Sequence, residues 1–406
     1  MNSTRWEKPP RWWSPKLSPA WLRFWRPFRR RHRLRKQRLL EVEVRGVEHV
    51  QDALGQGQGV LITPNHASHA DCFAIYEAAD RVGVPFYVMV AWQVLHYGGW
   101  LKRLILRHHG CFSVDREGTD FNALRKAREV LESQPYPLVI FPEGEVYHIN
   151  ERVTPFREGP AAIALLAARK ANRPIVCIPC AMEFRYLDDP TPQLLEVMSR
   201  LEEGLFCRPR PDLTLEQRIY HFAEGVLALK EIEFMGATYS GSVPDRIANL
   251  IEFLLGQIEA RHGMDPAGVT VPERVKALRR EAIKQLEDHP DDDPARLQAI
   301  EDLDDLFLVV QAFSYPGDYV TEKATIERIA ETLDKFEEDV LPAETATIRG
   351  SRRVTVSFGE PIPVPAERGK KGSAAALTDL IERRVQALLD EDRPSASQPA
   401  ASSQAG

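Results

Sequence analysis

Cysteine is scarce in this sequence. Only five occur among the 406 residues, and one pair, Cys177 and Cys180, has Cys-x-x-Cys spacing. No second pair completes a zinc site, and an odd number of cysteines argues against a disulfide framework. The pair lies in a predicted strand, where residues three apart point to opposite faces, so we expect both side chains to pack in the core. The sequence thus indicates no metal site and a reducing compartment.

Long apolar runs are also missing. No segment reaches the ~18 to 20 apolar residues needed to span a bilayer, and the N-terminal stretch lacks the apolar centre of a secretory signal. The length of 406 residues and the hydrophobic fraction of 43% are those of a globular protein with two or more domains. We expect any membrane association to be peripheral, on the cytoplasmic side.

Acidic residues are scarce near the N-terminus, where Glu7 is the only one between Arg5 and Arg38. Cations there alternate with tryptophan, whose ring favours the membrane interface, and each cation near an anionic leaflet gains about 1 kcal/mol. We therefore predict a basic-aromatic, membrane-associating arm over residues 1–40, with an anionic membrane surface as its partner. An arginine-rich arm can also bind nucleic acid, and a disordered tail is a third interpretation. We expect no nucleic-acid partner.

The most informative segment runs from His66 to Asp71. An apolar strand predicted over 58–63 ends at Pro64, so His66 should lie at the carboxyl end of this strand, where ligands bind in open α/β sheets. A helix predicted from Cys72 follows, and His66 must fold back from the loop to meet Asp71. A histidine with a nearby carboxylate can draw a proton from an alcohol at neutral pH. The alternative is that the two are unrelated polar residues of a loop and a helix cap.

Three further strand-like segments end in polar or turn-forming residues. Residues 110–116 end in Arg116, whose rigid fork suits a phosphate. Residues 138–144 are an apolar run that stops at Pro142-Glu143-Gly144, and residues 174–180 are an apolar run interrupted by proline. Together, and in this order, the four segments resemble the four motif blocks of the glycerolipid acyltransferase family, the 1-acylglycerol-3-phosphate acyltransferase-like domains.

The resemblance is specific in two blocks. Residues 65–71 match the first block, and Phe141-Pro142-Glu143-Gly144 matches the third. The likeness covers residues 55–186 and resumes at 353–362, which look like the strand and turn that close such domains. It implies that an acyl group passes from a thioester, on coenzyme A or acyl carrier protein, to a hydroxyl of a glycerol-phosphate-type lipid precursor. This is a step of phospholipid biosynthesis that needs no further cofactor.

The resemblance also implies roles for individual residues. His66 would be the general base that takes the proton from the acceptor hydroxyl, and Asp71 would hold the imidazole in the right tautomer and stabilise its charged form. The hydroxyl oxygen would attack the thioester directly, without an acyl-enzyme. Arg116 would bind the phosphate of the acceptor, and Pro179 would line the acyl site. The substrate-binding residues implied in this way are Asn65, Arg116, Phe141, Pro142, Glu143 and Gly144.

One position departs from the family pattern. Members that act on simple phosphate acceptors usually continue the third block with Thr-Arg-Ser, whereas Glu145-Val146-Tyr147 stands here. The missing cation leaves the acceptor open: Arg152 or Arg157 can supply it, or the acceptor is a lysophospholipid or an amino-acid lipid. A catalytically inactive, membrane-bound scaffold is a further alternative. The sequence has no Gly-x-Ser-x-Gly nucleophile elbow, which argues against a hydrolase.

Strand and helix patterns alternate over residues 41–187. Strands are predicted over 41–46 and 82–90, and helices over 119–133 and 160–172. This alternation predicts an α/β fold with a mixed, mostly parallel sheet flanked by helices.

The pattern changes after residue 187, where only helical periodicity is found as far as about residue 347. Because strand-like sequence returns near Val354, we predict an α-helical insertion at 188–347. The insertion interrupts an acyltransferase domain whose parts are 41–187 and 348–392. Residues 393–406 have no apolar pattern and should be disordered. We find no internal repeat. The helices of the insertion should be separated near Pro209, Pro244, Pro272 and Pro290.

Overall fold

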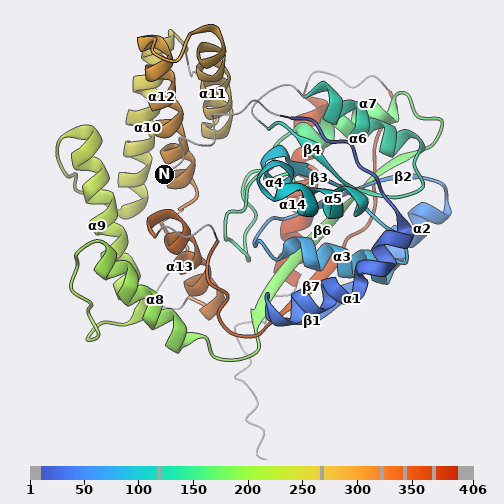
Figure 1. Ribbon diagram of the computed structural model, residues 1–406, viewed down its shortest axis with the longest axis horizontal. Coiled ribbons are helices and arrows are strands. Elements are labelled where there is room, and N and C mark those ends of the chain that lie inside the picture. The colour runs from blue at the N-terminus through green and yellow to red at the C-terminus, as the bar shows by residue number, and fades with distance from the viewer. Residues whose placement is uncertain are drawn as a thin grey trace, which may run out of the picture. The chain divides into compact units, whose positions relative to one another are not determined.

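The structure, a computed structural model, describes residues 11–116, 120–265, 269–315, 317–320, 324–341, 345–367 and 372–391. It divides into two compact units (Figure 1). The sheet unit comprises residues 12–114 and 121–188 and the described residues from 350 onward. The helical unit comprises residue 11 and the described residues of 115–120 and 189–349. The tail predicted over 393–406 and the first ten residues of the predicted arm lie outside the described residues.

The sheet unit is built on one sheet, which has eight strands within the described residues. They follow the spatial order β1-β7-β6-β2-β5-β3-β4, and β8 pairs with β6. Neighbouring strands are parallel except where β6 meets β7 and β8. The predicted α/β fold with a mixed, mostly parallel sheet is therefore confirmed. The strands are β1 (Leu39–Arg45), β2 (Gly59–Pro64), β3 (Tyr87–Ala91), β4 (Cys111–Val114), β5 (Leu138–Val139), β6 (Ile175–Tyr186), β7 (Arg352–Phe358) and β8 (Ile362–Pro363).

Apolar side chains alternate between the two faces of this sheet, as the period of two of a β-strand requires. On β2, Val60 and Ile62 belong to one core and Leu61 to the other. The first core includes α2 (Val47–Gly55) and α3 (Asp71–Val82), and the second includes α6 (Phe121–Ser133), α7 (Gly159–Ala168) and α14 (Ser373–Glu391). Cys180 lies in the first core and Cys177 in the second, so their predicted packing on opposite faces is confirmed. All five cysteines are free thiols.

Two strands differ from their predicted extents. The strand predicted over 82–90 is confined to β3, because α3 continues to Val82 and ends on Gly83, whose φ of 91° provides a left-handed cap. The strand predicted from Leu138 to the stop at Pro142 is reduced to β5, although the Ile140 N–H still donates to the Ile62 carbonyl at 3.1 Å. The chain then leaves the sheet. Since β5 is parallel to β2, the residues after both strands emerge at the same edge of the sheet.

Residues 12–40, predicted to be part of a separate arm, belong to the sheet unit. Helix α1 (Pro19–Arg35) is joined to α3 by ion pairs of Arg26 and Arg29 with Asp80, at 3.0 and 3.2 Å, and of Arg33 with Glu77, at 3.2 Å. Arg33 is buried and also donates to the Leu39 carbonyl at the start of β1. These arginines therefore dock the helix on the unit and are not available to a membrane.

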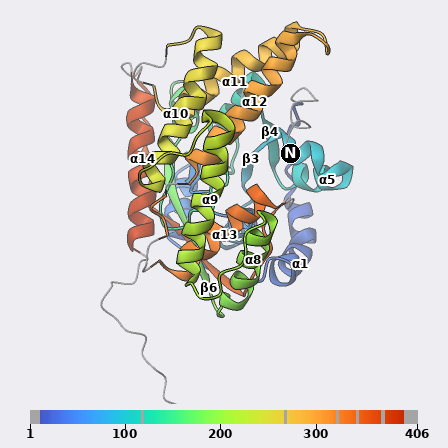
Figure 2. The ribbon, with the colours of Figure 1, turned by 90° about the vertical axis from the view of Figure 1, so that its left-hand side faces the viewer.

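Helices make up the regular structure of the described part of the helical unit, as predicted for the insertion. Helices α10, α11 and α12 pack on one another around an apolar core, and α8 packs on α9 and α13 (Figure 2). Pro244 and Pro272, predicted as breaks, occupy the first turns of α10 and α11, where the missing N–H has no helical partner to lose. The helices are α8 (Thr191–Gly204), α9 (Leu215–Met235), α10 (Val243–His262), α11 (Val271–Asp288), α12 (Pro294–Phe313) and α13 (Ile326–Val340).

The expectation of no internal repeat is wrong. The N-cap residues of α9, α10 and α11 follow one another at intervals of 28 residues, and the fourth residue after each cap is an arginine. Each arginine forms a two-pronged ion pair with a glutamate near the end of the preceding helix, with N–O distances of 2.6 to 2.9 Å. The pairs are Arg218 with Glu202, Arg246 with Glu231 and Arg274 with Glu259. The repeat extends from the helix junctions into the helices, because apolar residues also recur at the fifth and eighth positions after each cap. These residues are Ile219, Ile247 and Val275, and Phe222, Leu250 and Leu278.

Candidate active site

Two asparagines complete the edge of β6 beside the end of β2. The pairing of β2 with β6 stops at Cys180, while β6 continues to Tyr186. Asn65 accepts the Met182 N–H at 2.7 Å and donates to the Met182 carbonyl at 3.0 Å. Asn150 makes the same two bonds with Phe184, at 2.7 and 2.8 Å. Buried backbone groups need such partners, so the loops that carry both asparagines are fixed along β6.

His66 follows Asn65, and its imidazole folds back onto Asp71, the first residue of α3. Nδ1 lies 2.7 Å from Asp71 Oδ2, and the Ser68 N–H donates to the same oxygen at 3.1 Å. Asp71 is fully buried, whereas 23% of the His66 side chain is exposed. The start of a helix also favours a negative charge. With Asp71 ionised, the bond assigns the hydrogen to Nδ1 and leaves the Nε2 lone pair available, so the imidazole can accept a proton from a hydroxyl.

Residues of the third block hold His66 at three points. The Phe141 ring packs on the imidazole with 4.2 Å between centroids. Glu143 Oε1 accepts the His66 N–H at 2.7 Å, and the Tyr147 N–H donates to the His66 carbonyl at 3.4 Å. The first and third blocks, far apart in the sequence, therefore form one structure around the histidine.

Glu143 is a buried carboxylate, 2% exposed. Its Oε2 accepts the hydroxyl of Thr154 and, at 3.3 Å, the Thr154 N–H. Burial raises the pKa of Glu143 from 4.5 to about 7, against the opposing effect of its hydrogen bonds with Thr154 and His66. Thr154 is not among the predicted site residues, because nothing in the local pattern marks a threonine that contacts a residue eleven positions earlier.

Gly144 has a conformation that glycine adopts readily, with φ of 82°. A Cβ built at this position would lie 2.7 Å from Arg157 Nε. The Arg157 N–H donates to the Pro142 carbonyl at 2.9 Å. Burial raises the pKa of the Tyr147 phenol, while the Arg157 guanidinium lowers it. Of the two arginines suggested as replacements for the missing cation, Arg157 therefore lies against the third block, whereas Arg152 is exposed.

Comparison with known protein families assigns a family to this part of the chain. Residues 41–183 match the model of the Acyltransferase family, that of the 1-acylglycerol-3-phosphate acyltransferase-like domains. This part of the chain is an acyltransferase-family domain. The match includes the pair His66 and Asp71, called the dyad below, together with the third block and most of β6. No curated protein matches the chain. A general acyltransferase role follows from the domain.

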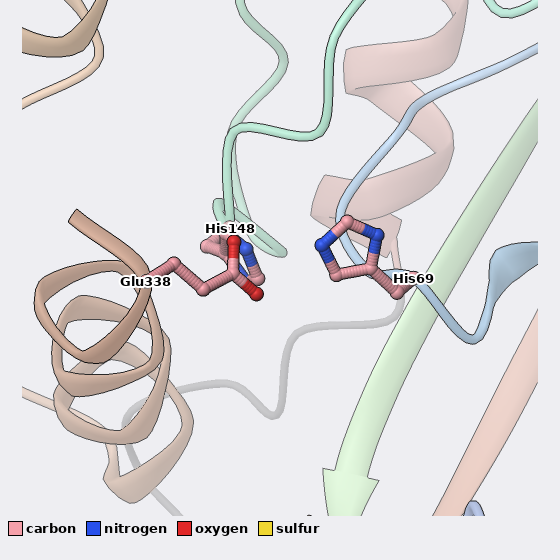
Figure 3. A group of neighbouring side chains, drawn as sticks. All are labelled: His69, His148 and Glu338. Atoms are coloured by element: carbon pink, nitrogen blue, oxygen red, sulfur yellow. The ribbon is translucent and has the colours of Figure 1, made fainter. Parts of the chain in front are cut away.

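Two other histidines of the acyltransferase domain lie close to each other. His69 belongs to the loop between His66 and Asp71, and His148 follows Tyr147. Their rings meet edge to face with 5.5 Å between centroids (Figure 3). His148 is buried and has a φ of 53°, rare for a residue with a side chain. Within the described residues of the sheet unit alone, no group of three histidine, cysteine or carboxylate side chains is arranged to hold a metal.

The remaining predicted site residues lie on two different elements. Pro179 lies within β6, opposite Thr63 of β2. Arg116 follows β4 by two residues and is half-buried. Arg116 belongs to the helical unit, whereas Asn65, Phe141 and Glu143 surround His66 within the sheet unit.

Proposed function

We propose that the chain transfers a fatty acyl group from acyl-coenzyme A or acyl carrier protein to a hydroxyl of a glycerol-phosphate-type lipid precursor. It would thus act as a 1-acylglycerol-3-phosphate acyltransferase-like enzyme of phospholipid biosynthesis, without a cofactor. The observation that carries the proposal is the 2.7 Å bond between His66 Nδ1 and Asp71 Oδ2 within a domain of the acyltransferase family.

The proposed reaction is direct transfer. Nε2 of His66 takes the proton of the acceptor hydroxyl while the oxygen attacks the thioester carbon. The tetrahedral intermediate then collapses, the carbon–sulfur bond breaks, and the departing thiolate recovers the proton from the imidazolium. Asp71 stabilises the imidazolium between these two events and keeps the ring oriented. The products are the acylated lipid and the free thiol.

The acceptor is proposed to bind through its phosphate. Arg116 takes this role by the family resemblance, and Arg157 is the cation that lies against the third block. Arginine suits a phosphate because its donors form a planar fork. The alternative acceptors, a lysophospholipid or an amino-acid lipid, are favoured by Glu145, which places a negative charge where the family pattern has a cation nearby.

We also propose that the protein binds the cytoplasmic face of an anionic membrane through α1. Phe24 and Phe28 are 62% and 53% exposed on this helix, and the side chains of Arg23 and Arg30 are exposed as well. Exposed aromatic rings beside cations suit the interface of an anionic bilayer. None of the helices among the described residues is long and apolar enough to cross a bilayer.

Substitution within α1 tests this membrane proposal better than removal of residues 1–40, because truncation would also remove the buried Arg33. The double variant Phe24→Ser with Phe28→Ser should sediment several-fold less with anionic vesicles, and added salt should weaken binding of the unmodified protein. The matched control replaces Leu229 and Ile232 of α9, which are 54% and 52% exposed. Equal losses from both double variants, or none from either, would contradict the assignment.

Lipid mass spectrometry of cells tests the proposed reaction. Cells that make the protein should contain an acylated lipid that is missing both from cells without it and from cells with the His66→Ala variant. The species that disappears identifies the acceptor and the acyl chain. If the His66→Ala cells keep the full lipid profile of the unmodified protein, the chain acts as a scaffold and the proposed reaction is wrong.

A further inference from the structure

Both oxygens of Glu143 are turned toward the protein. Oε1 accepts the main-chain N–H of His66, and Oε2 accepts the hydroxyl and N–H of Thr154. We propose that Glu143 is a positioning residue that holds the main chain of His66, and that Thr154 holds Glu143 in turn. The proposal rests on the proposed function insofar as His66 is the base whose position matters.

The bond from Glu143 is the strongest main-chain tether of His66. Its length of 2.7 Å and its carboxylate acceptor are typical of a charge-assisted hydrogen bond. The other main-chain tether, from the Tyr147 N–H, is 3.4 Å long. Asp71 orients the ring through Nδ1 but does not fix the backbone that carries it. A displacement of a catalytic group by about 1 Å can reduce the rate about 100-fold, so the tether should affect kcat.

Thr154 keeps Glu143 in place and favours its ionised form. Burial raises the pKa of the Glu143 carboxyl, and the hydrogen bond from the Thr154 hydroxyl opposes this shift more than any other contact does. Without the hydroxyl, Oε2 would keep only the Thr154 N–H at 3.3 Å. A neutral, loosely held Glu143 would form a weaker bond with the His66 N–H.

Thr154→Val tests the proposal, since it removes the hydroxyl and keeps the branched shape. We expect kcat to fall about tenfold or more while the KM values for thioester and acceptor stay within about twofold. Thr154→Ser keeps the hydroxyl and should restore most of the lost rate. The matched control is Thr378→Val in α14, because the buried Thr378 hydroxyl has no hydrogen-bond partner among the described residues. It should leave both constants unchanged.

Amide exchange tests the tether without any assay of activity. In protein labelled with 15N-histidine, the His66 amide should exchange with solvent at least about tenfold faster in Thr154→Val than in Thr154→Ser or Thr378→Val. This result would stand even if no acyl transfer were found, so it separates failure of the tether from failure of the proposed function. Equal exchange in all variants, or a rise in KM with kcat unchanged, would overturn the proposal.

A second pair of variants covers the case that Thr154→Val does not fold. Glu143→Gln keeps an oxygen for the His66 N–H, whereas Glu143→Leu has nearly the same size and no acceptor. We expect Glu143→Leu to lose about tenfold more kcat than Glu143→Gln, with faster His66 amide exchange. Equal losses of kcat and equal exchange in the two variants would show that the acceptor oxygen has no positioning role.

Discussion

Replacing Asp71 with asparagine separates the charge of the dyad from its shape. Asp71 Oδ2 accepts from His66 Nδ1 and from the Ser68 N–H, and the residue is fully buried at the start of α3. Its other oxygen, Oδ1, is buried without a hydrogen-bond partner among the described residues. The negative charge of Asp71 therefore stabilises the His66 imidazole, but its burial without a partner for Oδ1 destabilises the folded protein.

The expected effects on rate and on stability differ in direction. An asparagine cannot stabilise the imidazolium, and an amide group turned toward Nδ1 would place the ring hydrogen on Nε2, so kcat should fall by about 10³ to 10⁴ with little change in KM. A buried ionised oxygen without a partner costs about 1 to 3 kcal/mol or more. Removal of the charge recovers part of this cost, but it also removes the favourable interaction of the charge with the start of α3, which is worth about 0.5 kcal/mol. The free energy of unfolding of Asp71→Asn should thus equal or exceed that of the unmodified protein.

Two measurements on the same preparation test this prediction. Steady-state acyl transfer gives kcat and KM, and urea denaturation gives the free energy of unfolding. A variant that keeps more than about a tenth of kcat would refute the role of the charge. A loss of more than about 2 kcal/mol of stability would show that the unpartnered Oδ1 does not destabilise the folded protein.

Three other predictions concern stability. The pKa of Glu143 is raised to about 7, so the stability that its bound proton provides is fully present below about pH 4.5 and is lost as the pH rises through 7. Urea denaturation should show this loss, up to about 3 kcal/mol, and Glu143→Gln should lack it. Gly46→Ala should lower the free energy of unfolding, measured by urea denaturation, by more than about 3 kcal/mol, because its Cβ would lie 2.1 Å from the Phe358 carbonyl oxygen. Gly57→Ala, at a glycine with similar φ and open space around it, should lower it by about 1 kcal/mol. Equal losses in the two variants would contradict the clash. Arg246→Ala leaves Glu231 buried without its ion pair and should lower the free energy of unfolding by about 3 kcal/mol. The double variant Arg246→Met with Glu231→Leu should lose much less stability in the same thermal or chemical unfolding experiment. Equal losses would show that the unpaired charge is not the cause.

The sheet and the dyad could be predicted because their signals are local. Continuous apolar runs that stop at proline or glycine mark the strands near β2, β5 and β6, and His66 and Asp71 are separated by one short loop between a strand and a helix. The extent of β5 was harder to predict, because Phe141, the second residue after Val139, packs beside His66 instead of pairing in the sheet. Its ring lies on the imidazole.

The features that the sequence did not reveal depend on contacts between distant residues. Asn150 binds a strand 34 positions later, and Thr154 contacts Glu143 across a loop. The arginine-rich sequence of α1 predicted a membrane-binding arm, but Arg33 forms an ion pair with Glu77 on α3. The helical repeat was not predicted, because its recurring residues are single positions separated by residues that differ and form no continuous motif.

The rate of acyl transfer by purified His66→Ala shows whether His66 is the general base. The assay uses an acyl-coenzyme A donor, the acceptor identified in cells and anionic vesicles, with folding checked by circular dichroism. We expect the rate to fall about 10³-fold or more while folding and vesicle binding are unchanged. Transfer by the folded variant at a rate close to that of the unmodified protein would contradict it.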